Sequence, residues 1–398
     1  MLKPTSAHPL LSRRPSLVIA AATLLLVSSL LVGLLGCSAA GSTEPIKIGG
    51  LFAVTGFNSP LGTPEKETAL MLEEQINKAG GINGRPIKLI IYDTESDETK
   101  AVNLAKKLIE QDQVLAIIGP SSTGESLALV DTVEKAQVPL LSCAASAKIV
   151  QPVKKWVFKT PQSDSLAVSE IYDYLKAKGL TKVALLTSSG GFGTTGKAAL
   201  EEAAPTAGIS IIASESFGDK DTDMTVQLTK IKGSEAQALI VWGTNPGPAI
   251  IAKNMKQLGM SMPLFQSHGI ANRKFIELAG EAANGVIFPA GKLLVANGLP
   301  DSDPQKSLLV KYASDFKAKY NKDADTFGGH AYDALMMIKA AIEKGGADKA
   351  KIRDELEKLQ GFVGTAGIFN MSAADHNGLG KGSFVIVKIV DGQWTKEQ

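Results

Sequence analysis

The residues with the clearest potential for chemistry lie in loops rich in Gly, Ser, Thr and Asn that follow strand-like segments. Hydroxyl groups, backbone N–H groups and a nearby helix N-terminus can together hold a carboxylate. The strongest candidate is Gly-Pro-Ser-Ser-Thr-Gly-Glu at 119–125, where Ser122 or Thr123 can hold an anion. A simple helix N-cap explains the same residues equally well. The other candidate loops are 55–63, 143–146, 188–196, 243–247 and 267–270.

A glycine motif favours a different chemistry, nucleotide binding. Residues 191–196, Gly-Phe-Gly-Thr-Thr-Gly, match G-x-G-x-x-G between a predicted strand and a predicted helix, and Glu215 follows about 20 residues later. This pattern keeps a Rossmann-type NAD dehydrogenase as an alternative. Against it, the first βαβ unit lacks the fingerprint that such folds usually carry there. Free nicotinamide cofactor is also not expected outside the cytoplasm.

The histidine and cysteine residues form no recognisable catalytic or metal-binding pattern. His268, His330 and His376 are far apart and lack metal-ligand spacing. Cys143 could act as a nucleophile only if the fold brings a histidine close to it, and a buried structural thiol is the better interpretation. The acidic run 93–98 lacks the glycine and the terminal glutamate of a calcium loop, so we interpret it as a solvated turn. The sequence therefore predicts no metal, no cofactor and no enzymatic activity.

Residues 1–36 have the features of an export signal. Three basic residues precede a long uncharged stretch rich in Leu, Val, Ile and Ala, which ends in Leu-Leu-Gly before Cys37. This ending resembles the bacterial lipobox, so we expect a lipid on Cys37 and a short tether over 37–45. A retained transmembrane anchor is the alternative, because an apolar run of about 20 residues can span a bilayer. Both interpretations place the rest of the chain outside the cytoplasm.

The signal also accounts for the basic charge of the chain. The 398 residues include 42 basic and 40 acidic side chains, which gives a net charge of +2. Without Lys3, Arg13 and Arg14 the balance is 39 against 40, or −1. A nearly neutral exported chain gives no support for nucleic-acid binding. Two cysteines, one of them lipidated, exclude a disulfide framework.

Strand-like and helix-like segments must position these loops, and they alternate along the chain. Runs rich in β-branched residues, such as 46–54 and 182–187, alternate with amphipathic segments such as 99–110. This alternation is typical of α/β folds with parallel sheets flanked by helices. There are too many strands for one open sheet, so the sequence predicts two lobes. Further helices are predicted over 195–207, 308–320, 326–344 and 349–359, and a last strand over 383–390.

Several short segments between residues 77 and 272 carry a family resemblance. They are Asn-Lys-Ala-Gly-Gly-Ile-Asn-Gly-Arg-Pro-Ile at 77–87, Tyr-Asp-Thr-Glu-Ser-Asp at 92–97, Ile-Ile-Gly-Pro at 117–120, Val-Pro-Leu-Leu-Ser at 138–142 and Gly-Ile-Ala-Asn at 269–272. In this order they resemble the signature of branched-chain amino acid (leucine-binding-type) solute-binding proteins of ABC transporters. The resemblance implies a type I periplasmic-binding fold, with two α/β lobes, three hinge crossings and closure of the cleft on a ligand.

The resemblance also implies an organisation and a set of partners. Lobe 1 would comprise 46–160 plus 291–369, and lobe 2 would comprise 161–290 plus 370–398. The protein would be a monomer in the periplasm or at the cell surface, held at the membrane by the lipid on Cys37. It would bind a small-molecule carboxylate and deliver it to an ABC permease. A ligand sensor that reports to a signalling partner could use the same fold.

The resemblance assigns ligand-binding roles to particular loop residues. The carboxylate-holding loop corresponds to 122–124, and a second anchoring loop corresponds to 144–146. Phe192 corresponds to the aromatic lid of the second lobe, so the glycine-rich segment around it would serve ligand closure. Asn245 and Phe327 correspond to the side-chain pocket. The complete implied set is Ser122, Thr123, Gly124, Ala144, Ala145, Ser146, Phe192, Asn245, His268, Gly269 and Phe327.

One position departs from the family pattern. Amino acid binders place an acidic residue, which pairs with the ligand ammonium, where this sequence has His268. Histidine is a poor partner for a buried ammonium. We therefore expect a carboxylate without an α-amine, an aromatic or other organic acid, with Phe192 and Phe327 stacking on its ring and His268 donating a hydrogen bond to a ring substituent. The alternative is that another acid, such as Glu125, contacts an ammonium.

Overall fold

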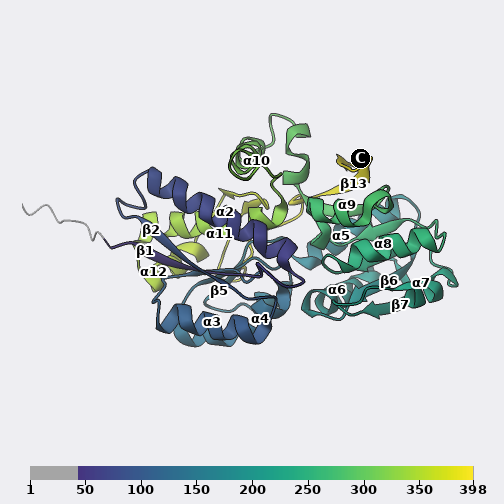
Figure 1. Ribbon diagram of the computed structural model, residues 1–398, viewed down its shortest axis with the longest axis horizontal. Coiled ribbons are helices and arrows are strands. Elements are labelled where there is room, and N and C mark those ends of the chain that lie inside the picture. The colour runs from purple at the N-terminus through teal and green to yellow at the C-terminus, as the bar shows by residue number, and fades with distance from the viewer. Residues whose placement is uncertain (1–43, 398) are drawn as a thin grey trace, which may run out of the picture. The chain divides into compact units, whose positions relative to one another are not determined.

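The structure is a computed structural model that describes residues 44–397 (Figure 1). Its first sheet has five parallel strands in the order β2-β1-β3-β4-β5. Crossover helices connect the first four strands, as parallel pairing requires. The elements are β1 (Ile46–Phe52), α2 (Ser59–Lys78), β2 (Ile87–Asp93), α3 (Glu98–Glu110), β3 (Ile117–Ile118), α4 (Thr123–Ala136), β4 (Leu140–Ser142), the 3₁₀ helix η1 (Ala147–Ile149) and β5 (Val157–Lys159).

The second sheet has seven strands in the order β14-β13-β10-β9-β8-β6-β7. The strands from β6 to β10 pair in parallel, and β13 and β14 add an antiparallel edge. The elements are α5 (Asp164–Ala177), β6 (Lys182–Ser188), α6 (Gly191–Ala207), β7 (Ser210–Phe217), α7 (Thr225–Lys232), β8 (Ala238–Trp242), α8 (Gly247–Gln257), β9 (Leu264–Gln266), η2 (His268–Ile270), α9 (Arg273–Ala279), η3 (Gly280–Ala283), β10 (Ile287–Gly291), β13 (Phe384–Val390) and β14 (Gln393–Lys396).

Helices cover both faces of each sheet. Successive side chains of a strand point to opposite faces, so each strand contributes to the core on both sides. In β1, Ile48 packs in a buried cluster with α2 and α11 (Thr326–Gly345), whereas Leu51 packs with α3 and α4 on the other face (Figure 1). In β6, Leu186 packs with α7 and α8, and Leu185 packs with α5 and α6. The segments between β10 and β13 in the chain are η4 (Lys292–Gly298), α10 (Lys306–Tyr320), α11 (Thr326–Gly345), α12 (Lys349–Glu357), β11 (Phe362–Val363) and β12 (Ile368–Phe369).

The five-stranded sheet with α2, α3, α4, α10, α11 and α12 is called the first lobe below, and the seven-stranded sheet with α5 to α9 is the second. The chain crosses between them after β5, after β10 and before β13. The first and third crossings are bonded to each other. Asn377 Nδ2 donates to the carbonyl oxygen of Pro161 at 2.9 Å, and Ser163 Oγ donates to Asn377 Oδ1 at 2.9 Å.

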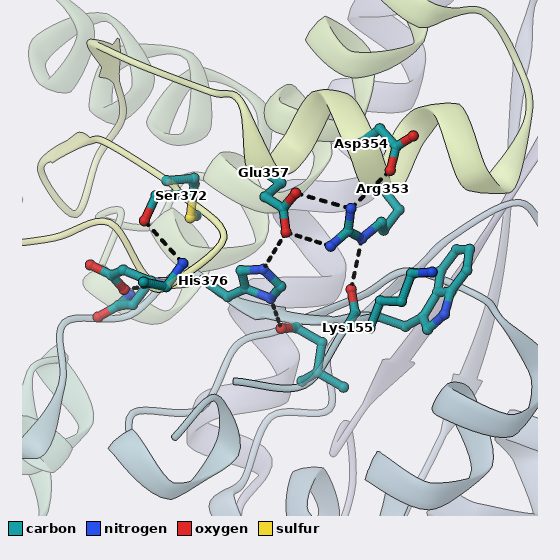
Figure 2. Close-up of polar contacts among 12 residues, drawn as sticks. Lys155, Arg353, Asp354, Glu357, Ser372 and His376 are labelled. Carbon is teal, nitrogen blue, oxygen red and sulfur yellow. Dashed lines mark hydrogen bonds and ion pairs between the residues drawn. The ribbon is translucent and has the colours of Figure 1, made fainter. Parts of the chain in front are cut away.

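A polar network holds the third crossing on the first lobe, and Figure 2 shows it around Glu357. Glu357 at the end of α12 accepts two hydrogen bonds from the Arg353 guanidinium, and its Oε1 lies 3.3 Å from His376 Nε2. The other ring nitrogen of His376 lies 2.9 Å from the carbonyl oxygen of Val157, and the ring stacks on Phe158 with 4.1 Å between centroids. The network therefore ties α12 and the crossing segment to β5.

The predicted α/β architecture with flanking helices is confirmed, with differences at particular elements. Helix α6 begins at Gly191, four residues before the predicted start, so the glycine motif lies inside the helix. The hairpin β11–β12 and the edge strand β14 are not among the predicted strands, because runs of two to four residues carry too little periodicity. The division into 46–160 plus 291–369 and 161–290 plus 370–398 remains a prediction.

Among the described residues, no helix is long and apolar enough to cross a membrane. The predicted signal over 1–36, the lipid site at Cys37 and nearly all of the predicted tether lie outside the described residues.

Candidate functional site

A cavity lies between the two lobes, where the loops that follow the parallel strands converge. It contains about 720 Å³ of space between protein atoms, counting its opening to solvent. Loops after β1, β3 and β4 line it from the first lobe, and loops after β6, β8 and β9 line it from the second. This is where parallel α/β sheets bind their ligands.

The cavity brings together nine of the eleven residues that the sequence predicted to bind a ligand. They come from five separate segments of the chain, which only the folded structure places side by side. The nine residues are Ser122, Thr123, Gly124, Ala144, Ala145, Phe192, His268, Gly269 and Phe327.

The start of α4 is the part of the cavity best suited to hold an anion. Ser122 is the N-cap of α4, and its Oγ accepts a hydrogen bond from the Glu125 N–H at 3.3 Å, while Glu125 Oε2 accepts one from the Ser122 N–H at 3.1 Å. The Ser122 hydroxyl therefore serves the helix, as the simpler interpretation of this loop predicted. Thr123 and Gly124 follow in the first turn, where backbone N–H groups lack helical partners and the helix dipole is positive. Their N–H groups can hold a carboxylate.

Two predicted residues, Ser146 and Asn245, do not line the cavity. Ser146 is fully buried, and its hydroxyl accepts a hydrogen bond from the Lys148 N–H at 3.2 Å, which caps η1. Asn245 is 1 % exposed, and neither atom of its amide has a hydrogen-bond partner within residues 44–397. Glu125, the alternative ammonium partner, is also buried and does not line the cavity. A ligand contact of Ser146 or Asn245 remains a prediction.

Close packing explains each of the three glycines in the glycine motif of α6. A Cβ atom on Gly193 would collide with the backbone at the end of β6, and one on Gly196 would collide with the indole of Trp242. Gly191 faces the other lobe, where a Cβ atom would lie 2.8 Å from Gly124 N. The motif therefore lets α6 pack closely on its own sheet and lets α6 approach α4 across the cavity.

An imidazole and three aromatic rings form one side of the cavity and the core behind it. His268 is 7 % exposed, and its ring lies 5.3 Å from Phe192, 5.7 Å from Trp242 and 5.3 Å from Phe384, measured between centroids. Burial, helped by the charge of Lys159, lowers the pKa of His268 to about 3, so the ring is neutral at physiological pH. Neither ring nitrogen has a hydrogen-bond partner within the described residues. An unpaired buried polar group costs about 1–3 kcal/mol, which a ligand can recover.

Two acidic residues and one histidine of the cavity are absent from the sequence-based set. Glu98 is exposed at the start of α3, and Asp219 is half-buried in the loop after β7, where burial raises its pKa. His330 is 5 % exposed in the first turns of α11, and burial lowers its pKa to about 3. His330 follows Phe327 by three residues on one helix, so helical periodicity could have placed both on the same face. Glu98 ends the acidic run that we interpreted as a solvated turn.

Hydrogen bonds between the lobes hold the cavity in a closed arrangement. Thr244 Oγ1 donates to Asn58 Oδ1 at 3.1 Å, and Asn272 Nδ2 donates to the carbonyl oxygen of Pro60 at 2.8 Å. In both pairs the donor belongs to the second lobe and the acceptor to the segment 58–60 of the first. The structure therefore shows the state in which both lobes contact the same enclosed space.

Comparison with known proteins identifies the same architecture. The family model described as periplasmic binding protein matches residues 45–393. The leucine-, isoleucine-, valine-, threonine- and alanine-binding protein of Pseudomonas aeruginosa is 27 % identical over 79 % of this chain and 83 % of its own.

Two solved structures show the likeness in three dimensions. An extracellular ligand-binding receptor from Rhodopseudomonas palustris HaA2 has a TM-score of 0.84 and 28 % identity, covering 89 % of this chain and all of its own. A branched-chain amino acid transporter substrate binding protein from Streptococcus pneumoniae, in complex with isoleucine, has a TM-score of 0.79 and 27 % identity, covering 88 % and 98 %. The predicted resemblance is thus confirmed, and this chain belongs to the periplasmic binding protein family with the type I fold.

Proposed function

We propose that this receptor captures an aromatic or other organic acid, in preference to an amino acid, and delivers it to an ABC permease. At a coarser level, the chain is a binding protein of the type that serves branched-chain amino acid ABC transport. The single observation that carries the finer proposal is the neutral, unpaired imidazole of His268 in the wall of the cavity.

The carboxylate of the ligand would bind at the first turn of α4. The N–H groups of Thr123 and Gly124 and the positive end of the helix dipole favour an anion there. Ala144 and Ala145 line the cavity from the loop after β4 and could add backbone contacts. None of these groups requires a buried cation, so the closed cavity can accept a carboxylate without a salt bridge.

The rest of the ligand would meet an apolar surface with few polar groups. Phe192 and Phe327 line the cavity from opposite lobes and would pack on a ring. His268 would donate a hydrogen bond to a substituent on that ring. A neutral imidazole attracts an ammonium weakly, and a protonated one repels it, so this wall disfavours an α-amine.

A specific observation supports amino acid binding as the second candidate function. Glu98 and Asp219 line the cavity, and either carboxylate could pair with an ammonium at its edge. The named relatives from Pseudomonas and Streptococcus bind, or are in complex with, branched-chain amino acids. Glu98 is exposed, so its attraction for an ammonium is screened by solvent and is weaker than that of a buried acid.

Calorimetric titration decides between the two candidates. The purified protein should bind benzoate more tightly than leucine or phenylalanine. Glu98→Gln should leave benzoate affinity unchanged or increase it, because the variant removes a negative charge near the anion. The proposal would be contradicted if leucine binds tightly and if Glu98→Gln or Asp219→Asn weakens that binding. This result would establish the amino acid function.

The transport role would follow from closure. The cross-lobe hydrogen bonds form only when the lobes meet, so a ligand that favours closure also creates the surface that a permease could recognise. A lipid on Cys37 would keep the receptor at the membrane. Transport of labelled benzoate by cells with and without the gene for this receptor tests the role, and sensing without uptake would favour a signalling partner.

A further inference from the structure

Two histidines that are 62 positions apart in the sequence line the same cavity from opposite lobes. His268 lies in η2 of the second lobe, and His330 lies in the first turns of α11 in the first lobe. Both side chains are more than nine-tenths buried, with exposed fractions of 7 % and 5 %. Closure of the lobes therefore places two imidazoles around one enclosed space.

Three of the four ring nitrogens of this pair lack a hydrogen-bond partner in the part of the chain that the structure describes. Both nitrogens of His268 and Nδ1 of His330 are buried without a hydrogen-bond partner within residues 44–397. Buried polar side-chain atoms are nearly always hydrogen-bonded in native proteins. By contrast, the third described histidine, His376, uses both of its ring nitrogens. The missing partner of the cavity pair is therefore expected to be part of a ligand.

The backbone around His330 is held in place independently of any ligand. Thr160 Oγ1 donates a hydrogen bond to the carbonyl oxygen of His330 at 3.0 Å, and Asp325 caps α11 by accepting one from the Gly328 N–H at 2.9 Å. The imidazole is thus presented to the cavity from a fixed helix turn, as a specificity-determining residue requires.

The protonation state of the pair selects the kind of group that it can bind. Burial lowers the pKa of each imidazole to about 3, with the charge of Lys159 contributing to both and mutual repulsion to His330. A neutral imidazole offers one N–H donor and one acceptor lone pair. A hydroxyl group can donate to one imidazole and accept from the other at once. An ammonium offers only donors and a carboxylate only acceptors, so neither uses the pair fully.

We propose that His268 and His330 together bind a hydroxyl group of the ligand, so that the preferred ligand is a hydroxylated aromatic acid. This inference rests on the proposed function, in which the carboxylate binds at α4 and the ring lies between Phe192 and Phe327. It adds His330 as a residue that determines specificity and names the substituent that the pair recognises. A site that bonds a hydroxyl group discriminates strongly against an analogue without it, because its own polar groups are then left unpaired.

Calorimetry with matched ligands tests the inference on the exported protein. The probes are benzoate, the three monohydroxybenzoates and the three methylbenzoates, which have similar size but no hydroxyl group. One hydroxybenzoate isomer should bind at least tenfold more tightly than the methylbenzoate with the same substitution. His330→Leu should abolish this preference, and His330→Gln, which keeps a donor and an acceptor, should restore part of it. His376→Gln is the control and should leave the preference unchanged.

Each outcome separates this inference from the proposed function. If the benzoates bind but no hydroxyl isomer exceeds its methyl counterpart, the inference is wrong and the proposed function stands. If His330→Leu retains the preference, His330 does not recognise the hydroxyl group. If none of the benzoates binds, whether or not leucine does, the aromatic ligand class and the inference are both overturned. Thermal unfolding of each variant identifies a loss of affinity that comes from a loss of fold.

Discussion

A close approach of the two lobes at the start of α4 offers a way to perturb closure. Gly191 begins α6 in the second lobe, and its neighbour across the cavity is the backbone of Gly124 in the first turn of α4. A Cβ atom on Gly191 would lie 2.8 Å from Gly124 N and 2.9 Å from Gly124 Cα. Both neighbours are backbone atoms, so no side chain can move aside. Gly191→Ala should therefore oppose closure.

The size of the effect follows from the overlap. Relieving it requires the lobes to part by several tenths of an ångström at this point, which also stretches the Thr244–Asn58 hydrogen bond of 3.1 Å. Overpacking of this kind costs about 1–3 kcal/mol. Because the ligand binds the closed state, its affinity should fall by about 5–150-fold. Position 191 lies outside the left-handed region, so alanine introduces no backbone strain within α6.

Calorimetry with benzoate and leucine, together with thermal unfolding of the ligand-free protein, checks this prediction. Gly191→Ala should weaken binding of whichever ligand the unaltered protein binds and leave ligand-free unfolding nearly unchanged. Gly193→Ala should instead lower the unfolding temperature, because its overlap lies within one lobe. Gly233→Ala, whose Cβ atom would meet nothing closer than 3.5 Å, is the matched control. Unaltered affinity in Gly191→Ala would refute the role assigned to this contact.

Three further predictions concern the cavity wall and the crossing network. Phe192→Ala should weaken binding of benzoate by about tenfold or more through lost ring contact, measured by calorimetry, with little change in unfolding temperature. Glu357→Ala removes the carboxylate shared by Arg353 and His376, both shielded from solvent, and should lower the free energy of unfolding by about 1–3 kcal/mol in urea titrations. Because the pKa of His330 is lowered in the folded protein, this imidazole takes up a proton at a higher pH in the unfolded chain than in the folded one. His330 therefore lowers the free energy of unfolding as the pH falls from about 6.5 to about 3. His330→Gln should reduce acid destabilisation over this window by at most about 1.4 kcal/mol per pH unit, and an identical pH profile would contradict the assignment.

Much of the fold was predictable because the relevant signals are local. Strand-like runs alternate with amphipathic segments, and that alternation follows from burial of both faces of a parallel sheet. The loops with binding potential follow from the same pattern, since they succeed strands whose carboxyl ends share one edge. The Gly-rich and Ser-rich loops at 119–125 and 188–196 therefore line the same cavity.

The remaining parts of the site depend on contacts between distant segments. Glu98 borders the cavity only because α3 and α4 start side by side, which no local pattern of the acidic run reveals. His330 belongs to α11, which returns to the first lobe after strands β6 to β10 of the second lobe. The hydroxyl of Ser122 was ambiguous, because a cap and an anion site need the same residue type. The position of the Glu125 side chain in the structure shows that Ser122 forms a capping box with it.

A crystal structure of the protein grown with benzoate and leucine together is the most direct test of the central claim. Our account predicts benzoate in the cavity, with its carboxylate on the N–H groups of Thr123 and Gly124 and its ring between Phe192 and Phe327. Leucine in the cavity, with its ammonium bound to Glu98 or Asp219, would contradict it.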